Sequence, residues 1–104
     1  MNGQFEGQGM MFFANVGTYK GCFSDGNIDG IGRFEYLNGS IYDGDWKENK
    51  KHGKGKFIDT DGVSIYNGDW ENDFKHGKGT FLQRESYIIE GIWNKGNLVE
   101  MTKF

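Results

Sequence analysis

The sequence predicts an all-β fold, a single-layer antiparallel meander of about four to five β-hairpins that forms a twisted ribbon. Three observations predict it. Glycine provides 18 of the 104 residues and proline none, whereas the average glycine share is about 7%. The apolar residues are rich in rings, with nine Phe, five Tyr and three Trp. A motif of about 23 residues recurs along the chain, which indicates a repeat architecture.

The first half of each repeat predicts a strand. Its columns alternate an aromatic residue with glycine at period two, as expected where successive side chains point to opposite faces. The copies open at Tyr19, Tyr42, Tyr66 and Ile89. A glycine follows two residues later in each copy. Two further on stand Phe23, Trp46, Trp70 and Trp93.

The second half of each repeat predicts the partner strand, with a Gly-x-Gly pair ahead of a phenylalanine. The pairs are Gly30 and Gly32, Gly53 and Gly55, and Gly77 and Gly79, and the phenylalanines are Phe34, Phe57, Phe81 and Phe104. A turn is predicted between the halves, at residue types that tolerate a left-handed backbone. These are Gly26, Asn49, Asp73 and Gly96. Asn38-Gly39 and Asp61-Gly62 are turn dipeptides that join successive hairpins.

These columns divide one domain, 1–104, into repeats. Residues 1–18 form a partial repeat, 19–41, 42–65 and 66–88 form full repeats, and 89–104 form a partial capping repeat. In the last copy, Glu100 and Thr102 replace the Gly-x-Gly pair, as is typical of a terminal repeat. Because the chain begins and ends inside a repeat, we expect unpaired sheet edges and end-to-end self-association.

In an antiparallel pair, the positions of facing residues add up to a constant number. One such sum, applied to the two strands of each copy, predicts the register. It places Tyr42 opposite Phe57 and Gly44 opposite Gly55 on one face, together with Trp46 opposite Gly53. On the other face it predicts the pairs Asp45–Lys54, Asp43–Lys56, Asp69–Lys78, Glu90–Lys103, Ile92–Met101 and Lys20–Arg33. The glycines would then leave space for rings to lie flat on the sheet.

The motif Tyr-x-Gly-x-Trp followed by Gly-x-Gly resembles the MORN repeat (membrane occupation and recognition nexus). The resemblance rests on Tyr42-Asp43-Gly44-Asp45-Trp46 and its counterparts at Tyr19 and Tyr66, each with its glycine pair. It implies a hairpin ribbon that organises proteins or membranes and is not an enzyme. The resemblance also implies a setting at the cytoskeleton, a cilium or a membrane, and the single cysteine, Cys22, favours the cytoplasm. A further hypothesis that the resemblance implies is that the chain is a regulatory module of an enzyme.

The row of rings on one face predicts a protein-binding groove, because large apolar patches usually mark partner surfaces. We expect it to hold a helix or an extended segment of a partner. The predicted contact residues are Tyr42, Trp46, Phe57, Tyr66, Trp70, Phe81 and Trp93. The alternative is that these rings serve only as the core of the ribbon.

Basic residues near the turns suggest a second partner, an anionic phospholipid membrane. The segment from Lys47 to Lys56 holds five lysines and His52 against Glu48. The lysines without an acidic partner in the predicted register, and the histidines beside them, form the candidate lipid site. They are Lys50, Lys51, His52, Lys75 and His76.

The sequence contains no set of residues typical of catalysis. His52 and His76 share a column but lack a third ligand or a nucleophile in a defined motif, so we expect neither a metal nor a cofactor. Cys22 is the only cysteine, which excludes an intramolecular disulfide and favours a reducing compartment. The net charge of −3 argues against a nucleic-acid partner, since such domains are usually strongly basic.

Overall fold

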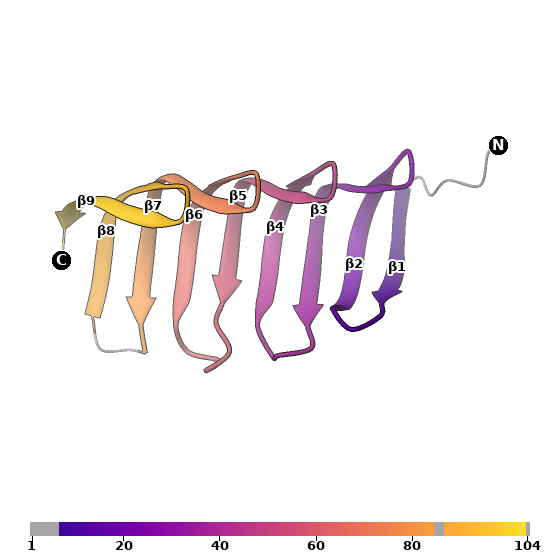
Figure 1. The fold of residues 1–104 in the computed structure, drawn as a ribbon, viewed down its shortest axis with the longest axis horizontal. Helices are drawn as coiled ribbons and strands as arrows, with labels where there is room; N and C mark the ends of the chain where they lie inside the picture. The colour runs from indigo at the N-terminus through magenta and orange to yellow at the C-terminus, as the bar shows by residue number, and fades with distance from the viewer. Residues whose placement is uncertain (1–6, 85–86, 104) are drawn as a thin grey trace.

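The computed structural model describes residues 7–84 and 87–103, and it forms one open nine-stranded sheet (Figure 1). The strands are β1 (Gly7–Phe13), β2 (Gly17–Ser24), β3 (Asn27–Tyr36), β4 (Ile41–Lys47), β5 (Lys50–Ile58), β6 (Ile65–Glu71), β7 (Phe74–Gln83), β8 (Tyr87–Asn94) and β9 (Asn97–Lys103). They lie side by side in chain order, and each neighbour is antiparallel. The predicted all-β meander is confirmed. None of these residues forms a helix able to cross a membrane.

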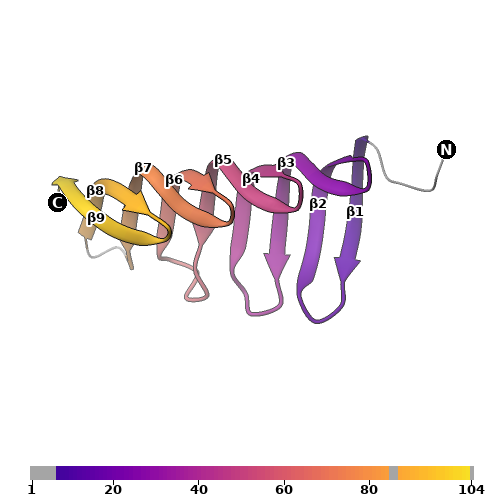
Figure 2. The same ribbon diagram turned by 45° about the horizontal axis from the view of Figure 1, so that its top comes forward.

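Two-residue turns close the hairpins at the predicted positions. Both turn residues have positive φ, as type I′ turns require. The pairs are Asp25-Gly26, Glu48-Asn49, Asn72-Asp73 and Lys95-Gly96. Figure 2 shows these turns along one edge of the ribbon and the connections between hairpins along the other. The ribbon is 51 Å in its longest dimension.

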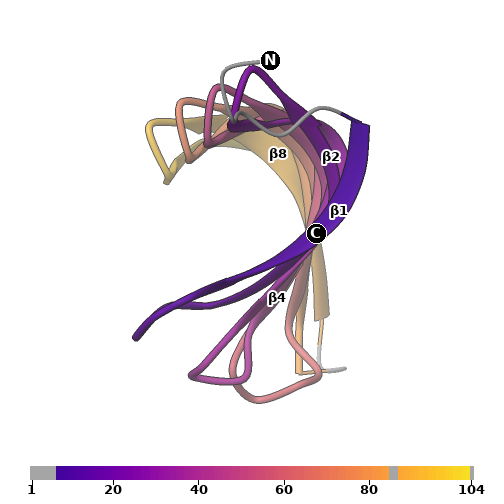
Figure 3. The same cartoon turned by 90° about the vertical axis from the view of Figure 1, so that its right-hand side faces the viewer.

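The hairpins β2–β3, β4–β5 and β6–β7 each contain a β-bulge. In the β4–β5 ladder, Gly44 pairs with Gly55, but the next pair is Trp46 with Lys51. Asp45 therefore stands opposite the three residues 52–54. The same irregularity follows Gly21 in β2 and Gly68 in β6. Bulges bend a strand locally, and Figure 3, viewed along the ribbon, shows the strands curving into an arch.

The bulges correct part of the predicted register. Trp46 lies opposite Lys51 and not opposite Gly53, and the pairs Asp45–Lys54 and Asp69–Lys78 fall outside the ladders. A constant pairing sum fails because one strand of the hairpin carries extra residues. Asp45 and Lys54 still touch, since the Lys54 backbone N–H donates to Asp45 Oδ2 at 3.2 Å. The Lys54 ammonium instead pairs with Asp69 of the next hairpin.

Of the other predicted cross-strand pairs, some are confirmed and one is wrong. Tyr42–Phe57, Gly44–Gly55, Asp43–Lys56, Lys20–Arg33 and Glu90–Lys103 have the predicted register. In the last hairpin, Ile92 pairs with Glu100 and Met101 with Gly91, because the β8–β9 ladder has two further irregularities.

The repeated tyrosine explains the Gly-x-Gly column. The Tyr42 ring lies flat against the neighbouring strand, so that a Cβ placed on Gly55 would sit 2.0 Å from Tyr42 Oη. Tyr42 Oη also donates to the Asp45 backbone carbonyl at 2.9 Å, within the bulge. Tyr19 and Tyr66 have the same arrangement, and burial raises the pKa of each to about 12. The tyrosine thus fills the inside of the bend and holds it closed.

Candidate functional site

The rings lie on the concave side of the arch. Lys51 Nζ is 5.9 Å from the centroid of the Phe57 ring, although the two residues are six positions apart on β5 and would be about 20 Å apart along a straight strand. Lys51 Nζ also lies 5.2 Å from the Tyr36 ring centroid. The two arms of each hairpin therefore approach each other on this side. We call the space between them the inner groove.

The floor of the inner groove is a buried ladder of tyrosine and tryptophan rings. Tyr42 is completely buried, and Trp46, Trp70 and Trp93 are 5–6% exposed. The Tyr42 ring meets the Trp46 and Trp70 rings edge to face, with centroids 5.0 and 5.2 Å apart. Trp46 Nε1 and Trp70 Nε1 donate to backbone carbonyls of the preceding hairpin. Trp46 and Trp70 thus each link their hairpin to the one before it.

The predicted protein-binding residues are therefore brought together, but they differ in accessibility. Tyr42, Tyr66 and the three tryptophans form the floor, where a partner would reach little of their surface. Phe57 and Phe81 are half-buried and lie above that floor. Sequence reasoning missed the other partly exposed rings beside them, which are Phe13 and Tyr36. Phe13, Tyr36, Phe57 and Phe81 form the loop wall of the inner groove.

Lys51 and Lys75 were expected at solvated turns, yet both side chains enter the inner groove. The Lys51 side chain is 14% exposed, and its ammonium lies within 6 Å of five ring centroids. Lys75 Nζ lies 5.1 Å from the Tyr66 ring centroid and 5.3 Å from that of Phe81. Burial lowers the pKa of Lys75, and the charge of Asp59 opposes that shift. With Ile28, these lysines form the turn wall of the inner groove.

The remaining members of the predicted lipid site lie elsewhere. Lys50 is exposed, and it lines a hollow with His52 and Glu71. His76 Nε2 is 3.2 Å from Glu71 Oε1. The bulge separates the predicted cluster into two groups, because it turns Lys51 and Lys75 inward. A signal for this was present in the sequence, since their column also holds Ile28 and Leu98.

Hydrogen bonds between successive turns position the turn wall. Asn49 Oδ1 accepts from the Ile28 backbone N–H at 2.8 Å, and the Asn49 N–H donates to the Ile28 carbonyl at 2.9 Å. Asp73 makes the same two bonds to Lys51, at 2.8 and 3.1 Å. The left-handed residue of one turn therefore fixes the wall residue of the hairpin before it.

The profile of the MORN repeat matches residues 1–15, 19–41, 42–64 and 66–83. This match and the stacked Tyr-Gly-Trp hairpins decide the family. The chain belongs to the MORN-repeat family. A comparison with curated proteins found no similar sequence. MORN repeats are modules of protein–protein or membrane interactions.

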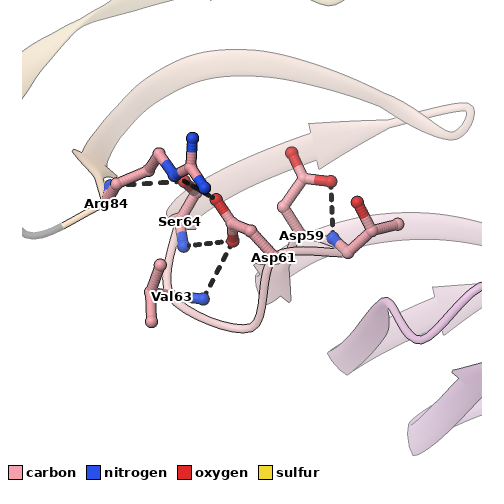
Figure 4. A network of polar contacts seen from close by, with 6 residues as sticks. Asp59, Asp61, Val63, Ser64 and Arg84 are labelled. Carbon is pink, nitrogen blue, oxygen red and sulfur yellow. Dashed lines mark hydrogen bonds and ion pairs between the residues drawn. The ribbon is translucent and has the colours of Figure 1, made fainter.

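A polar network holds the connection between the second and third full MORN repeats (Figure 4). Asp61 Oδ1 accepts from the backbone N–H groups of Val63 and Ser64, and Asp61 Oδ2 accepts from Ser64 Oγ at 2.6 Å. Arg84 Nε lies 3.4 Å from the same Oδ2 atom. The hydrogen bonds from Ser64, then that from Val63, lower the pKa of Asp61 to about 2. This network fixes the end of the hairpin beside the loop wall.

Two features of the described part of the chain concern the grouping of its metal-binding side chains and the partners of its buried polar atoms. Within residues 7–84 and 87–102, no three His, Cys, Asp or Glu side chains gather closely enough to hold a metal ion. The same part of the chain leaves no buried side-chain nitrogen or oxygen without a hydrogen bond. The inner groove presents its half-buried rings and its two lysines, together with Asp73 beside Lys51.

Proposed function

We propose that this MORN-repeat chain is a non-catalytic scaffold that binds a helix or an extended segment of a partner protein in its inner groove. The observation that carries the proposal is the loop wall, where Phe13, Tyr36, Phe57 and Phe81 expose part of their rings on the concave side. Exposed apolar surface in a concave site is typical of partner surfaces.

The scaffold supports such binding by being pre-organised. The buried ring ladder, the bonds between turns and the Asp61 network fix both walls before a partner arrives. A rigid surface loses little conformational freedom on binding, which favours affinity. We extend the proposal to a cytoplasmic setting at the cytoskeleton or a cilium, as the family resemblance implies.

A protein partner is favoured over an anionic membrane. Two of the five residues of the candidate lipid site, Lys51 and Lys75, turn into the inner groove. His76 contacts Glu71, and the hollow beside Lys50 and His52 also contains Glu48 and Glu71. Such mixed charge gives anionic lipid little net attraction, since each juxtamembrane Lys or Arg contributes only about 1 kcal/mol.

Site-specific photo-crosslinking tests the proposal. A benzophenone side chain is introduced at Phe57 or Phe81, in the groove, and at Lys56 as the matched control, because neighbouring strand residues face opposite sides. We expect a crosslinked partner from positions 57 and 81 and not from 56. We also expect Phe57→Leu with Phe81→Leu to reduce recovery of that partner by about fivefold or more.

Two results would contradict the proposal. One is crosslinking of a partner at 56 in preference to 57 and 81. The other is co-sedimentation with phosphatidylserine vesicles that Lys50→Glu abolishes, with no protein captured from the groove positions, which would support the membrane interpretation.

A further inference from the structure

The inner groove changes in polarity along the ribbon. At equivalent positions of successive hairpins, its turn wall carries Ile28, Lys51 and Lys75. Phe13 lines the same hollow as Ile28. Lys51 Nζ lies 5.2 Å from the Tyr36 ring centroid, and Lys75 Nζ lies 5.3 Å from the Phe81 ring centroid. The facing pair thus changes from two apolar residues at the first position to a cation with a ring at the next two. The groove is most apolar between the first hairpins.

A hollow of about 320 Å³ lies at this apolar end, near the lower limit of the about 300–1,000 Å³ usual for ligand pockets. Phe13, Val16, Ile28 and Tyr36 line it, with Lys51 and Asp73 on the side toward the next hairpin. Its origin is the residue at position 28. Lys51 reaches across the groove to the Tyr36 ring, whereas the shorter Ile28 side chain leaves the corresponding space open.

The charge beside the hollow selects among occupants. Lys51 contributes an ammonium whose nearest carboxylate oxygen, Asp73 Oδ1, is 4.0 Å away, and that oxygen already accepts the Lys51 backbone N–H. A cationic side chain entering the hollow would meet the Lys51 ammonium and be repelled. A carboxylate would gain a charge-assisted hydrogen bond from it.

We propose that this hollow is an anchor pocket for one large apolar side chain of the partner segment, with a neighbouring carboxylate of that segment bound by Lys51. The inference rests on the proposed function and specifies the partner: an acidic segment with a bulky aromatic or aliphatic anchor. Val16, 46% exposed, forms the accessible lip of the pocket.

Small indole compounds test the pocket without knowledge of the partner. The full chain, labelled with ¹⁵N, is titrated with indole-3-propionate, with its neutral amide and with the cation tryptamine. We expect amide shifts centred on Val16, Ile28, Tyr36 and Lys51. Affinity should fall in the order carboxylate, amide, cation, with about tenfold between the first and the last, as for a hydrogen bond to a charged group.

Residues exchanged within a repeat column provide the variants. Ile28→Lys fills the hollow with the residue that the next two repeats have there, and we expect it to abolish binding of all three compounds. Val16→Trp fills it from the exposed lip and should do the same, so that a folding defect in one variant leaves the other decisive. Lys51→Ile should keep indole binding but remove the preference for the carboxylate. Lys50→Ile is its matched control and should retain that preference.

The inference is overturned if the compounds shift no amide around Ile28. It is also overturned if folded Ile28→Lys or Val16→Trp binds them unchanged, or if Lys51→Ile keeps the preference. Its failure is distinct from failure of the proposed function. In that case, crosslinking at Phe57 and Phe81 would still capture a partner, whereas the compounds would not bind at Ile28.

Discussion

Asp73 Oδ1 accepts a hydrogen bond from the Lys51 backbone N–H at 2.8 Å and lies 4.0 Å from Lys51 Nζ. One turn side chain therefore positions both the backbone and the ammonium of a groove residue in the preceding hairpin. Asn49 performs the backbone part of this role for Ile28 with a neutral amide. Asp73 and Asn49 also adopt the left-handed conformation that the type I′ turn needs, with φ of 74° and 70° respectively.

The first prediction separates these roles of Asp73. Asp73→Asn keeps the acceptor and the turn preference, as Asn49 shows, so we expect a change in unfolding free energy below about 0.5 kcal/mol for this partly exposed pair. Asp73→Ala removes the acceptor from the Lys51 N–H and should cost about 1–2 kcal/mol. Chemical denaturation of the three proteins measures both values. Equal losses for Asn and Ala would show that the charge, and not the acceptor, stabilises the turn.

The second prediction concerns the glycine under the Tyr42 ring. Gly55→Ala would place Cβ 2.0 Å from Tyr42 Oη and 2.3 Å from Cζ, and the ring is fully buried and cannot move aside. We expect a loss of about 3 kcal/mol or more, at the upper end of overpacking effects, measured by thermal and chemical unfolding. Gly9→Ala is the control, because a Cβ there has ordinary contacts at 3.5 Å. Similar stability of the two variants would refute the packing role of Gly55.

The sequence-based prediction succeeded where the columns themselves carry the constraint. Alternation of rings and glycines predicts the strands, and Asn49 and Asp73 mark their turns because few residue types accept that backbone. The bulge after Gly44 was not predicted, because a pairing sum assumes equal residue numbers on both strands. That omission placed Lys51 and Lys75 at the solvated turns.

The same bulge explains why the candidate site was only partly predicted. The predicted single layer left the tryptophan faces accessible, whereas the bent hairpin buries Trp46 and Trp70 between its arms. Accessibility shifts to rings such as Tyr36, whose column holds Phe13 and then Asp59 and Gln83. Because this repeat column mixes aromatic, acidic and amide residues, the sequence pattern does not predict that it lines the loop wall of the inner groove. The bend has to be known before the two sides of the groove can be related.

The third prediction uses the half-buried side chain of Lys75. Desolvation lowers its pKa below the usual 10.5, which means that the protonated form is less favourable in the folded than in the unfolded chain. Lys75→Met should therefore raise the melting temperature at pH 7, since Ile28 and Leu98 show that the column accepts apolar side chains. The gain should shrink as the pH rises through the lowered pKa toward 10.5.

Lys50→Met, at an exposed turn, is the control and should change little. A lower melting temperature for Lys75→Met would show that its contacts with the Tyr66 and Phe81 rings outweigh desolvation.

The fourth prediction is a stability change in acid that depends on Asp61. Its pKa is lowered from 3.8 to about 2 in the folded chain, so the folded state favours the charged form. The resulting stabilisation is fully present above the unfolded pKa of 3.8 and is lost as the pH falls toward 2.

Asp61→Asn removes the titration but keeps an acceptor, as in the preceding repeat, where Asn38 Oδ1 accepts from Ser40 N–H and Oγ at 2.9 and 2.7 Å. We expect the melting temperature of the unmodified chain to exceed that of Asp61→Asn by a constant amount above pH 5. The difference should close between pH 4 and 2, while the other carboxylates affect both proteins equally. A difference that does not depend on pH would mean that the Asp61 hydrogen bonds stabilise the connection without favouring its charge.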